Sequence, residues 1–383
     1  MRELIKYEYK KIFQRRSTWI SLIVAVMWIL FSGISGVLGD YYVDGEKAGS
    51  RLSKVRKERA ALEEMTGQKL DEAFFREAGN QGREQEKYSQ LYVLYAMMAG
   101  QIGEVELEKS NEMDFYEYRS QMLEKIFQKE KLSAGEAAFH RKEGEQVKIP
   151  YDYGNMLGFD QYFRIQGTNG AILAFVIAIC LAPIFSLEYS SHMDSLILSS
   201  RFGKNKVIQA KLITGISFSL LFTLLLFGIF FLEIKGVYGL SGWNLPVQVS
   251  ASGFYLSIPI NLLEMLVIST ACCLAASCMT AVFVMFCSSR MNTPFGVIII
   301  SFIFIFLPEI LILAVAEYRS LFMIVNSMPT SMMHANGVMA DQLFAVGNHY
   351  FYFFQFVPVV YVLLILPLTM WIRRSFRNHQ IIS

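Results

Sequence analysis

Residues 169–187, NGAILAFVIAICLAPIFSL, form an uncharged and mainly apolar run of the length that crosses a bilayer as a helix. Further runs of this kind lie near 19–38, 210–234, 258–287, 294–316 and 351–371. The chain is 54% hydrophobic and only 18% charged, whereas soluble domains carry about 25% charged residues. The sequence therefore predicts an all-α, polytopic membrane protein with six transmembrane helices.

Most of the charged residues lie between residues 40 and 165. This block contains 19 basic and 24 acidic residues, a net charge of −5. Its apolar residues keep the three-four spacing of helices, and Ser133 with Glu136 matches a helix capping box. We expect residues 39–168 to form a helical extracytoplasmic domain inserted between the first and second spans. A solvated cap and a ligand-binding domain are both compatible with this pattern.

Lysine and arginine placement in the short flanks of the spans predicts the orientation. Fourteen of these residues lie at the N-terminus, in loops 188–211 and 288–293 and in the C-terminal tail, whereas the opposite short loops contain only Lys235 and Arg319. Basic residues in short flanks favour the cytoplasmic side. We therefore expect a multi-pass cell-membrane protein with both termini in the cytoplasm. The long first apolar run lacks a small-residue cleavage site, which favours an uncleaved anchor over a signal peptide.

The sequence contains none of the short motifs of common enzyme chemistry. It has no G-x-x-x-x-G-K-[ST] phosphate loop, no H-E-x-x-H and no G-x-S-x-G pattern. The five histidines are scattered, and the five cysteines lie in predicted spans without metal-ligand spacing. We expect no catalytic, metal or cofactor site and no nucleic-acid partner.

Small residues recur at every fourth position in the fourth predicted span. Such rows let helices approach closely in lipid. They predict tight helix packing by two sets of residues: Cys272, Ala276 and Thr280, and Ser269, Cys273 and Ser277.

The loop between the second and third spans has a helical pattern. Residues 185–212 read FSLEYSSHMDSLILSSRFGKNKVIQAKL. Ser190 or Ser191 is a candidate cap for a helix that runs to about Ser199, with Met193 and Ile197 on its apolar face. A short amphipathic helix in a cytoplasmic loop suits docking into a groove of a soluble partner, and a solvated loop with ordinary positive-inside charge is the alternative.

This stretch resembles the loop between the second and third spans of ATP-binding-cassette transporter permeases of the second exporter type. The resemblance rests on Phe185, Glu188, Ser190–Ser191, Leu196–Leu198, Ser199–Ser200, Arg201 and Lys211. Asp194, an acid early in the expected helix as the helix dipole favours, is a further candidate residue of this loop. His192–Met193 and Arg201–Gly203 depart from the family pattern, which has small residues and a proline-arginine turn there. The N-terminal ELIKYEYKKIFQRRSTWI is similar to the family's amphipathic N-terminal helix and carries Glu8, Lys11 and Arg16. Its membrane-surface face is expected to contain Ile5, Tyr9 and Ile12. None of residues 40–165 is covered by the resemblance.

The resemblance implies a division of the chain and a set of partners. Residues 1–18 are a cytoplasmic amphipathic helix, 19–38 the first span, and 169–383 a five-helix membrane domain with a cytoplasmic coupling loop at 188–210. Two permease subunits, identical or sister chains, pair in the bilayer, and separate ATPase subunits bind the ATP. The implied function is an exporter subunit without its own nucleotide site. The resemblance does not extend to the substrate, so peptides, drugs, lipids and ions all stay open. The principal alternative is a membrane-anchored sensor or scaffold whose external helices bind a ligand.

Two acidic residues lie within predicted spans. Glu264 is about seven residues into the fourth span, and Glu309 adjoins Pro308 in the fifth. A carboxylate in lipid is costly and marks a candidate functional site. We consider both as possible pathway residues, with an interfacial or backbone-satisfying role as the alternative.

Overall fold

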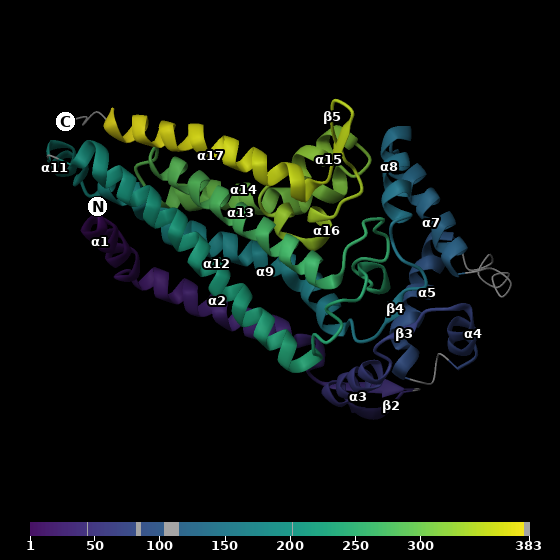
Figure 1. Cartoon of the computed structure of the whole chain (residues 1–383). Coiled ribbons are helices and arrows are strands. Elements are labelled where there is room, and N and C mark those ends of the chain that lie inside the picture. Colours follow the sequence, from purple (N-terminus) through teal and green to yellow (C-terminus); the bar gives the residue numbers. More distant parts are fainter. Residues whose placement is uncertain (44, 82–85, 103–114, 201, 379–383) are drawn as a thin grey trace.

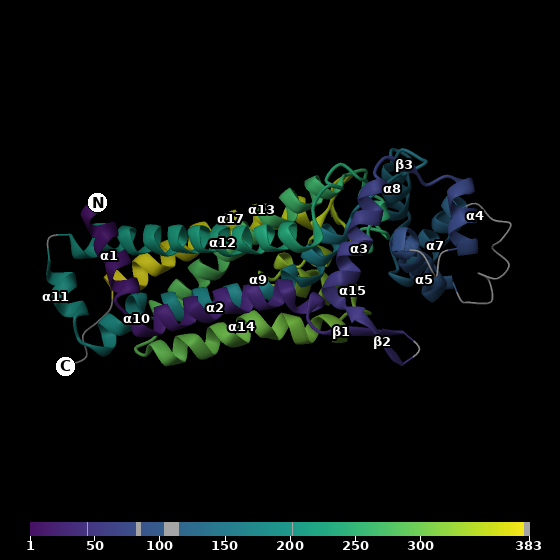
Figure 2. The same ribbon diagram turned by 90° about the horizontal axis from the view of Figure 1, so that it is seen from below.

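The computed structural model describes residues 1–43, 45–81, 86–102, 115–200 and 202–378. The fold is mostly helical and elongated, with a bundle of long helices at one end and a cluster of shorter elements at the other (Figures 1 and 2). Within the described residues, six helices are long and apolar enough to cross a membrane. They are α2 (Arg16–Ile34), α9 (Leu157–Leu181) continued by α10 (Pro183–Ser190), α12 (Ile208–Tyr238), α13 (Leu262–Ser288), α14 (Pro294–Ala314) and α17 (Phe353–Arg377).

Each of the six predicted spans coincides with one of these helices. The largest difference in position is at α9, which begins twelve residues before the predicted residue 169. Its first turns are polar, and they are buried against other elements instead of lipid. Conversely, α13 begins at Leu262, later than the predicted residue 258, because Asn261 caps it and residue Pro246 forms a β-bridge with Asn261.

The helix α13 lies at the centre of the bundle. It contacts α9, α12, α14 and α17. Both of its rows of small residues are buried, since Cys272, Ala276, Thr280, Ser269, Cys273 and Ser277 are at most 2% exposed. The close packing that these rows predict therefore occurs within the chain.

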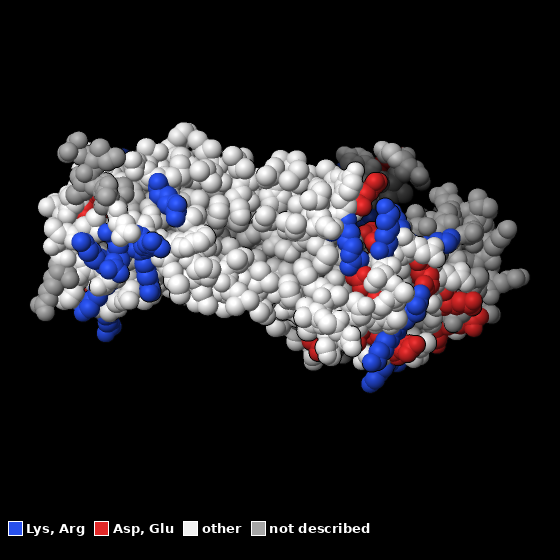
Figure 3. Space-filling model, turned by 90° about the horizontal axis from the view of Figure 1, so that it is seen from above, with Lys and Arg blue, Asp and Glu red and all other residues white. Residues whose placement is uncertain are grey.

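The outer helices present large apolar side chains to the surroundings. On α14, Phe295, Ile310 and Leu313 are each more than two-thirds exposed. Space-filling Figure 3 shows an almost uncharged band between two charged ends. Such a band is larger than soluble monomers leave exposed, and hydrocarbon is the medium that covers it without cost.

Residues between α2 and α9 form a compact helical insertion at one end of the bundle (Figure 1). Its helices are α3 (Arg51–Glu64), α4 (Glu72–Gln81), α5 (Ser89–Ile102), α7 (Phe115–Lys129) and α8 (Ala134–Gly144), with short 3-10 turns η1 (Ser35–Val37) and η2 (Glu86–Tyr88). The predicted capping box is present at α8, where Ser133 and Glu136 bond each other's backbone N–H groups. The described part of the insertion also contains two antiparallel pairs: β1 (Asp40–Val43) with β2 (Glu46–Ser50), and β3 (Gln68–Lys69) with β4 (Asp152–Tyr153).

The loops that join α12 to α13 and α14 to α17 lie at the same end as the insertion. They contain η5 (Val247–Val249), α15 (Arg319–Asn326), η6 (Ser331–Met333) and α16 (Ala335–Val338), and an antiparallel hairpin of β5 (Phe344–Val346) and β6 (His349–Phe351). The insertion and these loops form one packed cap.

The opposite end holds the N-terminus, the short helices α1, α10 and α11, and the C-terminal end of α17 (Figures 1 and 2). Helix α1 (Arg2–Phe13) precedes α2, and α11 (Asp194–Ser199) and a π-helical turn η4 (Gly203–Val207) lie between α10 and α12. The helix predicted to end near Ser199 is present but begins later than expected. Its N-cap is Met193, without a side-chain bond, because Ser190 still belongs to α10.

Candidate functional site

Four residues that the sequence analysis singled out separately meet in one buried ion-pair network. Lys211 of α12 lies 2.7 Å from Glu188 of α10 and 3.1 Å from Glu8 of α1. Lys11 of α1 bonds the same two carboxylates, at 2.8 Å from Glu188 and 3.0 Å from Glu8. We name these residues, Glu8, Lys11, Glu188 and Lys211, the four-residue network. Its two positive and two negative side chains balance.

Lys211 is the most deeply buried member. Its side chain is 0% exposed. An ammonium has three protons to donate, and Lys211 bonds three acceptors: Glu8, Glu188 and the carbonyl oxygen of Ile184 at 2.7 Å. A buried charge is tolerated when it is paired and hydrogen-bonded in this way. The network therefore fixes α1, α10 and α12 to one another.

The lysine on α1 is held in its charged form. Burial opposes a charge on Lys11, but the carboxylates of Glu188 and Glu8 outweigh that effect and raise its pKa above the ordinary value. The third residue predicted for this helix, Arg16, lies outside the network as the exposed first residue of α2.

The N-terminal helix packs differently from the prediction. Ile12, expected on a membrane-surface face, is buried, and Tyr9 bonds the hydroxyl of Ser217 on α12 at 2.7 Å. Tyr7 and Phe13 are the exposed apolar side chains of α1. The amphipathic face predicted from the sequence is therefore turned toward α12, where Glu8 bonds Lys211 and Tyr9 bonds Ser217.

A second set of contacts fixes the other side of α10. The backbone N–H groups of Phe185 and Ser186 both donate to the hydroxyl of Ser288 at the end of α13, at 3.0 Å. Tyr189 donates to the carbonyl of Ser289, and Phe185 and Tyr189 contact the ring of Phe376 on α17. Helix α10 is thus joined to α1, α12, α13 and α17, four of the elements that cross or border the bundle.

Helix α11 and the residues on either side of it extend beyond α10 and present apolar side chains. Leu196 is 63% exposed, Met193 48% and Phe202 44%, whereas Asp194 is buried and Leu198 partly buried. Arg201, named in the sequence analysis, lies outside the described residues. The N–H of Met193 donates to the carbonyl of Glu188 at 2.9 Å, which ties α11 to the end of α10. Lysine and arginine side chains gather on this end of the molecule (Figure 3).

The two acidic residues of the spans have different surroundings. Glu264 is the third residue of α13, nearer the helix start than predicted, and forms a capping box in which it accepts from the N–H of Asn261 at 2.8 Å. Glu309 lies 3.0 Å from Nε2 of His334. The imidazole of His334 rests on Gly167 of α9, where a Cβ would overlap the ring. Glu264 therefore has a local structural role, whereas Glu309 joins α14 to the segment after it.

The contacts that hold the cap together were not predicted from the sequence. Arg119 of α7 is buried and donates to the carbonyls of Phe254 and Leu256, at 2.7–3.1 Å. Glu136 accepts from Arg319 of α15 and from the N–H of Leu343. The sequence does mark Arg119 as unusual, because its helical spacing places it on the apolar face defined by Phe115 and Met122. An arginine there requires acceptors that only distant segments supply.

In the described part of the chain, no three His, Cys, Asp or Glu side chains are grouped so that they could hold a metal ion. No protein-family model, curated protein or solved structure matches the sequence or the fold. The class that the described helices support is that of a multi-pass, helical membrane protein.

Proposed function

We propose that the chain is the membrane-spanning permease subunit of an ATP-binding-cassette exporter of the second exporter type, driven by a separate ATPase subunit. The observation that carries the proposal is the attachment of α11 to α10, which is itself bonded to the rest of the bundle. Leu196 on α11 and the flanking Met193 and Phe202 offer an exposed apolar docking surface. The preceding helix, α10, is fixed to four other elements. Force applied to α11 is therefore passed to the bundle.

The mechanism follows from this attachment. Closure of the ATPase on ATP moves α11, and α11 moves the end of α10 through the bond from Met193 to Glu188. The four-residue network transmits the displacement to α1 and α12, while Ser288 and Phe376 transmit it to α13 and α17. A rigid joint suits this role, because packed interfaces switch between discrete arrangements rather than deform continuously.

The orientation is proposed from the basic residues. The end with α1, α11 and the C-terminus holds the concentration of lysine and arginine seen in Figure 3, which favours the cytoplasm. The insertion then lies outside the cell membrane, together with the loops that it binds through Arg119 and Glu136.

A second permease subunit, identical or sister, is expected to complete the translocation path. The small-residue rows of α13 are buried within the chain and are not its contact surface. The exposed apolar faces of the outer helices, including that of α14, offer the area instead. Glu309 and His334 adjoin that face, which keeps Glu309 as a proposed pathway residue, while Glu264 satisfies its own helix end.

The deciding experiment is purification of the tagged protein from its native membranes in mild detergent. We expect a partner with a phosphate-loop sequence that hydrolyses ATP, in a complex with two permease subunits. Leu196→Asp should release that ATPase. Val346→Asp, which alters a similarly exposed apolar residue at the opposite end, should retain it. Purification without an ATPase, or with a kinase, would replace the proposal by the membrane-anchored sensor.

A further inference from the structure

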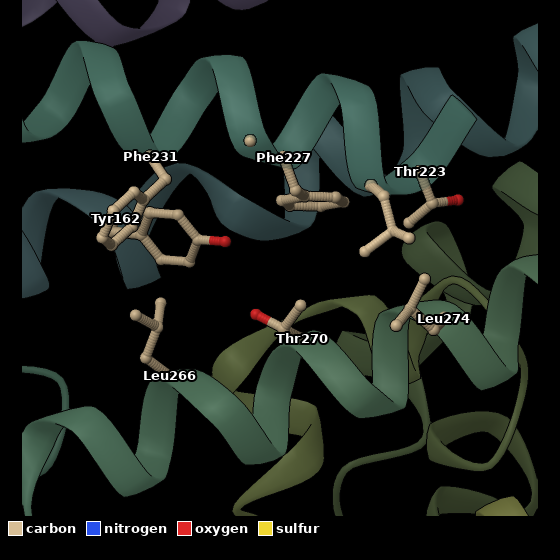
Figure 4. Close-up of a pocket in the computed structure, with 9 residues that line it drawn as sticks. Tyr162, Thr223, Phe227, Phe231, Leu266, Thr270 and Leu274 are labelled. Carbon is tan, nitrogen blue, oxygen red and sulfur yellow. The ribbon is translucent and has the colours of Figure 1, made fainter. Parts of the chain in front are cut away.

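A pocket between α9, α12 and α13 shares no residue with the four-residue network or with α10 (Figure 4). Its volume is about 220 Å³. Tyr162, Thr223 and Phe227 form the buried floor, and Leu224 at the rim is 51% exposed. The lining segments, 223–231 and 266–274, lie in the half of the bundle nearer to the insertion.

The mouth of the pocket opens onto the apolar outer surface of the bundle. The surrounding side chains of α12 and α13 are exposed and aliphatic: Leu221, Leu225, Leu232 and Val267 are each more than half exposed. This is the surface that hydrocarbon covers in a membrane protein. The pocket is therefore a recess in the lipid-facing wall.

The chemistry of the lining selects an apolar occupant. The hydroxyls of Tyr162 and Thr270 point toward one another (Figure 4), and the Thr223 hydroxyl donates to its own helix at the carbonyl of Ser219, 2.7 Å away. The lining has no charged side chain. Apolar cavities exclude water, and an empty recess forfeits dispersion contacts along its whole wall.

The volume of the recess suits a segment of a hydrocarbon chain and not a whole ligand molecule. Pockets for complete drug-sized molecules have volumes of about 300–1,000 Å³, more than this recess provides. We propose that it binds the acyl chain of a membrane lipid from the leaflet nearer to the insertion. The site does not depend on an ATPase partner or on transport.

Two glycines of α12 provide a matched pair of variants. Gly228 lines the pocket, and a Cβ there meets no atom within 4 Å. Gly236 is equally open but does not line the pocket. Gly228→Leu therefore begins its side chain in open space at the recess and is designed to fill it, and Gly236→Leu makes the same change about two turns away. Leu274→Trp fills the recess from α13 and serves as an independent second variant.

The test uses phosphatidylcholine vesicles that contain a phosphatidylcholine with a diazirine near the end of one acyl chain. After illumination, adducts are mapped by mass spectrometry and normalised to those on α14 and α17, which report ordinary lipid contact. We expect adducts enriched in 223–231 and 266–274, lost in Gly228→Leu and Leu274→Trp, and retained in Gly236→Leu. Uniform labelling, or enrichment that persists in both filled variants, would overturn the proposal.

Discussion

Lys211 donates a 2.7 Å hydrogen bond to Glu188, and this contact joins α12 to the end of α10. The two residues are close in sequence, but a helix end, a turn, α11 and a π-helical turn lie between them. The same lysine reaches Glu8 of α1. The bond therefore closes loop 188–210 at its base, and α11 extends beyond it.

Removing Lys211 should destabilise the protein strongly. Lys211→Met leaves two buried carboxylates with Lys11 as their only lysine partner. Breaking a buried pair on one side costs about 3–5 kcal/mol. The free energy of unfolding, measured in detergent, should fall by that order, and adding Glu188→Gln should recover part of the loss by removing one unbalanced charge. Lys204→Met, which alters an exposed lysine of the same loop, is the control. Equal free energies of unfolding for Lys211→Met and Lys204→Met would show that the network does not contribute to stability.

The two acidic residues of the spans should respond differently to neutralisation. Glu309→Gln removes the charge that faces His334 and should change substrate-stimulated ATP turnover of the assembled complex. Glu264→Gln keeps an acceptor for the N–H of Asn261, since glutamine also completes capping boxes. Its effect on stability should be less than about 1 kcal/mol, with normal turnover. Unchanged turnover in the Glu309 variant would assign that residue a structural role.

The cap contains two titratable groups with opposite pH dependence. His140 of α8 is buried, with Nε2 2.7 Å from the carbonyl of Asp341, and burial lowers its pKa despite the nearby Glu136 and Glu143. Burial, aided by the charge of Glu130, raises the pKa of the Asp341 carboxyl from 3.8 to about 7. The folded cap therefore favours a neutral histidine and a protonated aspartate.

Substituting one of these two residues at a time should reveal how the other makes stability depend on pH. In Asp341→Asn, His140 is the member of the pair that still titrates. Its contribution to the free energy of unfolding should be complete above its ordinary pKa of 6.5 and should be lost as the pH drops below that value. In His140→Gln only Asp341 remains, so stability should rise as the pH falls through about 7. Unfolding temperatures measured from about pH 8 to about pH 5 test this. Parallel curves for the two variants would contradict the assignment.

Cysteine labelling tests the orientation in intact cells. Ser241→Cys and Glu46→Cys, both exposed at the cap end, should react with a membrane-impermeant maleimide added outside. Ser199→Cys, exposed at the end of α11, should react only after the membrane is opened. The native cysteines in the described helices are buried or partly buried, so their background should be low. External reaction at Ser199→Cys would rule out docking of a cytoplasmic ATPase on α11.

The local pattern of the sequence predicted features that depend on neighbouring residues. Apolar runs of sufficient length predict six spans because every backbone polar group in hydrocarbon must be satisfied within its own helix. The capping box at Ser133 and Glu136 was recognisable for the same reason, since both partners lie within one turn. Glu8, Lys11, Glu188 and Lys211 were each identified, but only as separate motif residues.

Only the tertiary structure decided which of those residues meet. Lys211 and Glu8, which pair in the network, are 203 positions apart in the sequence. The carbonyls that accept hydrogen bonds from Arg119 belong to a loop more than 130 residues away. Helical periodicity states which side of a helix is apolar, but not whether lipid or another helix covers it. The prediction that Ile12 faces the membrane surface was therefore wrong, because α1 packs against α12. The small-residue rows of α13 were recognised as contact surfaces, but their partners within the chain followed from how the helices assemble.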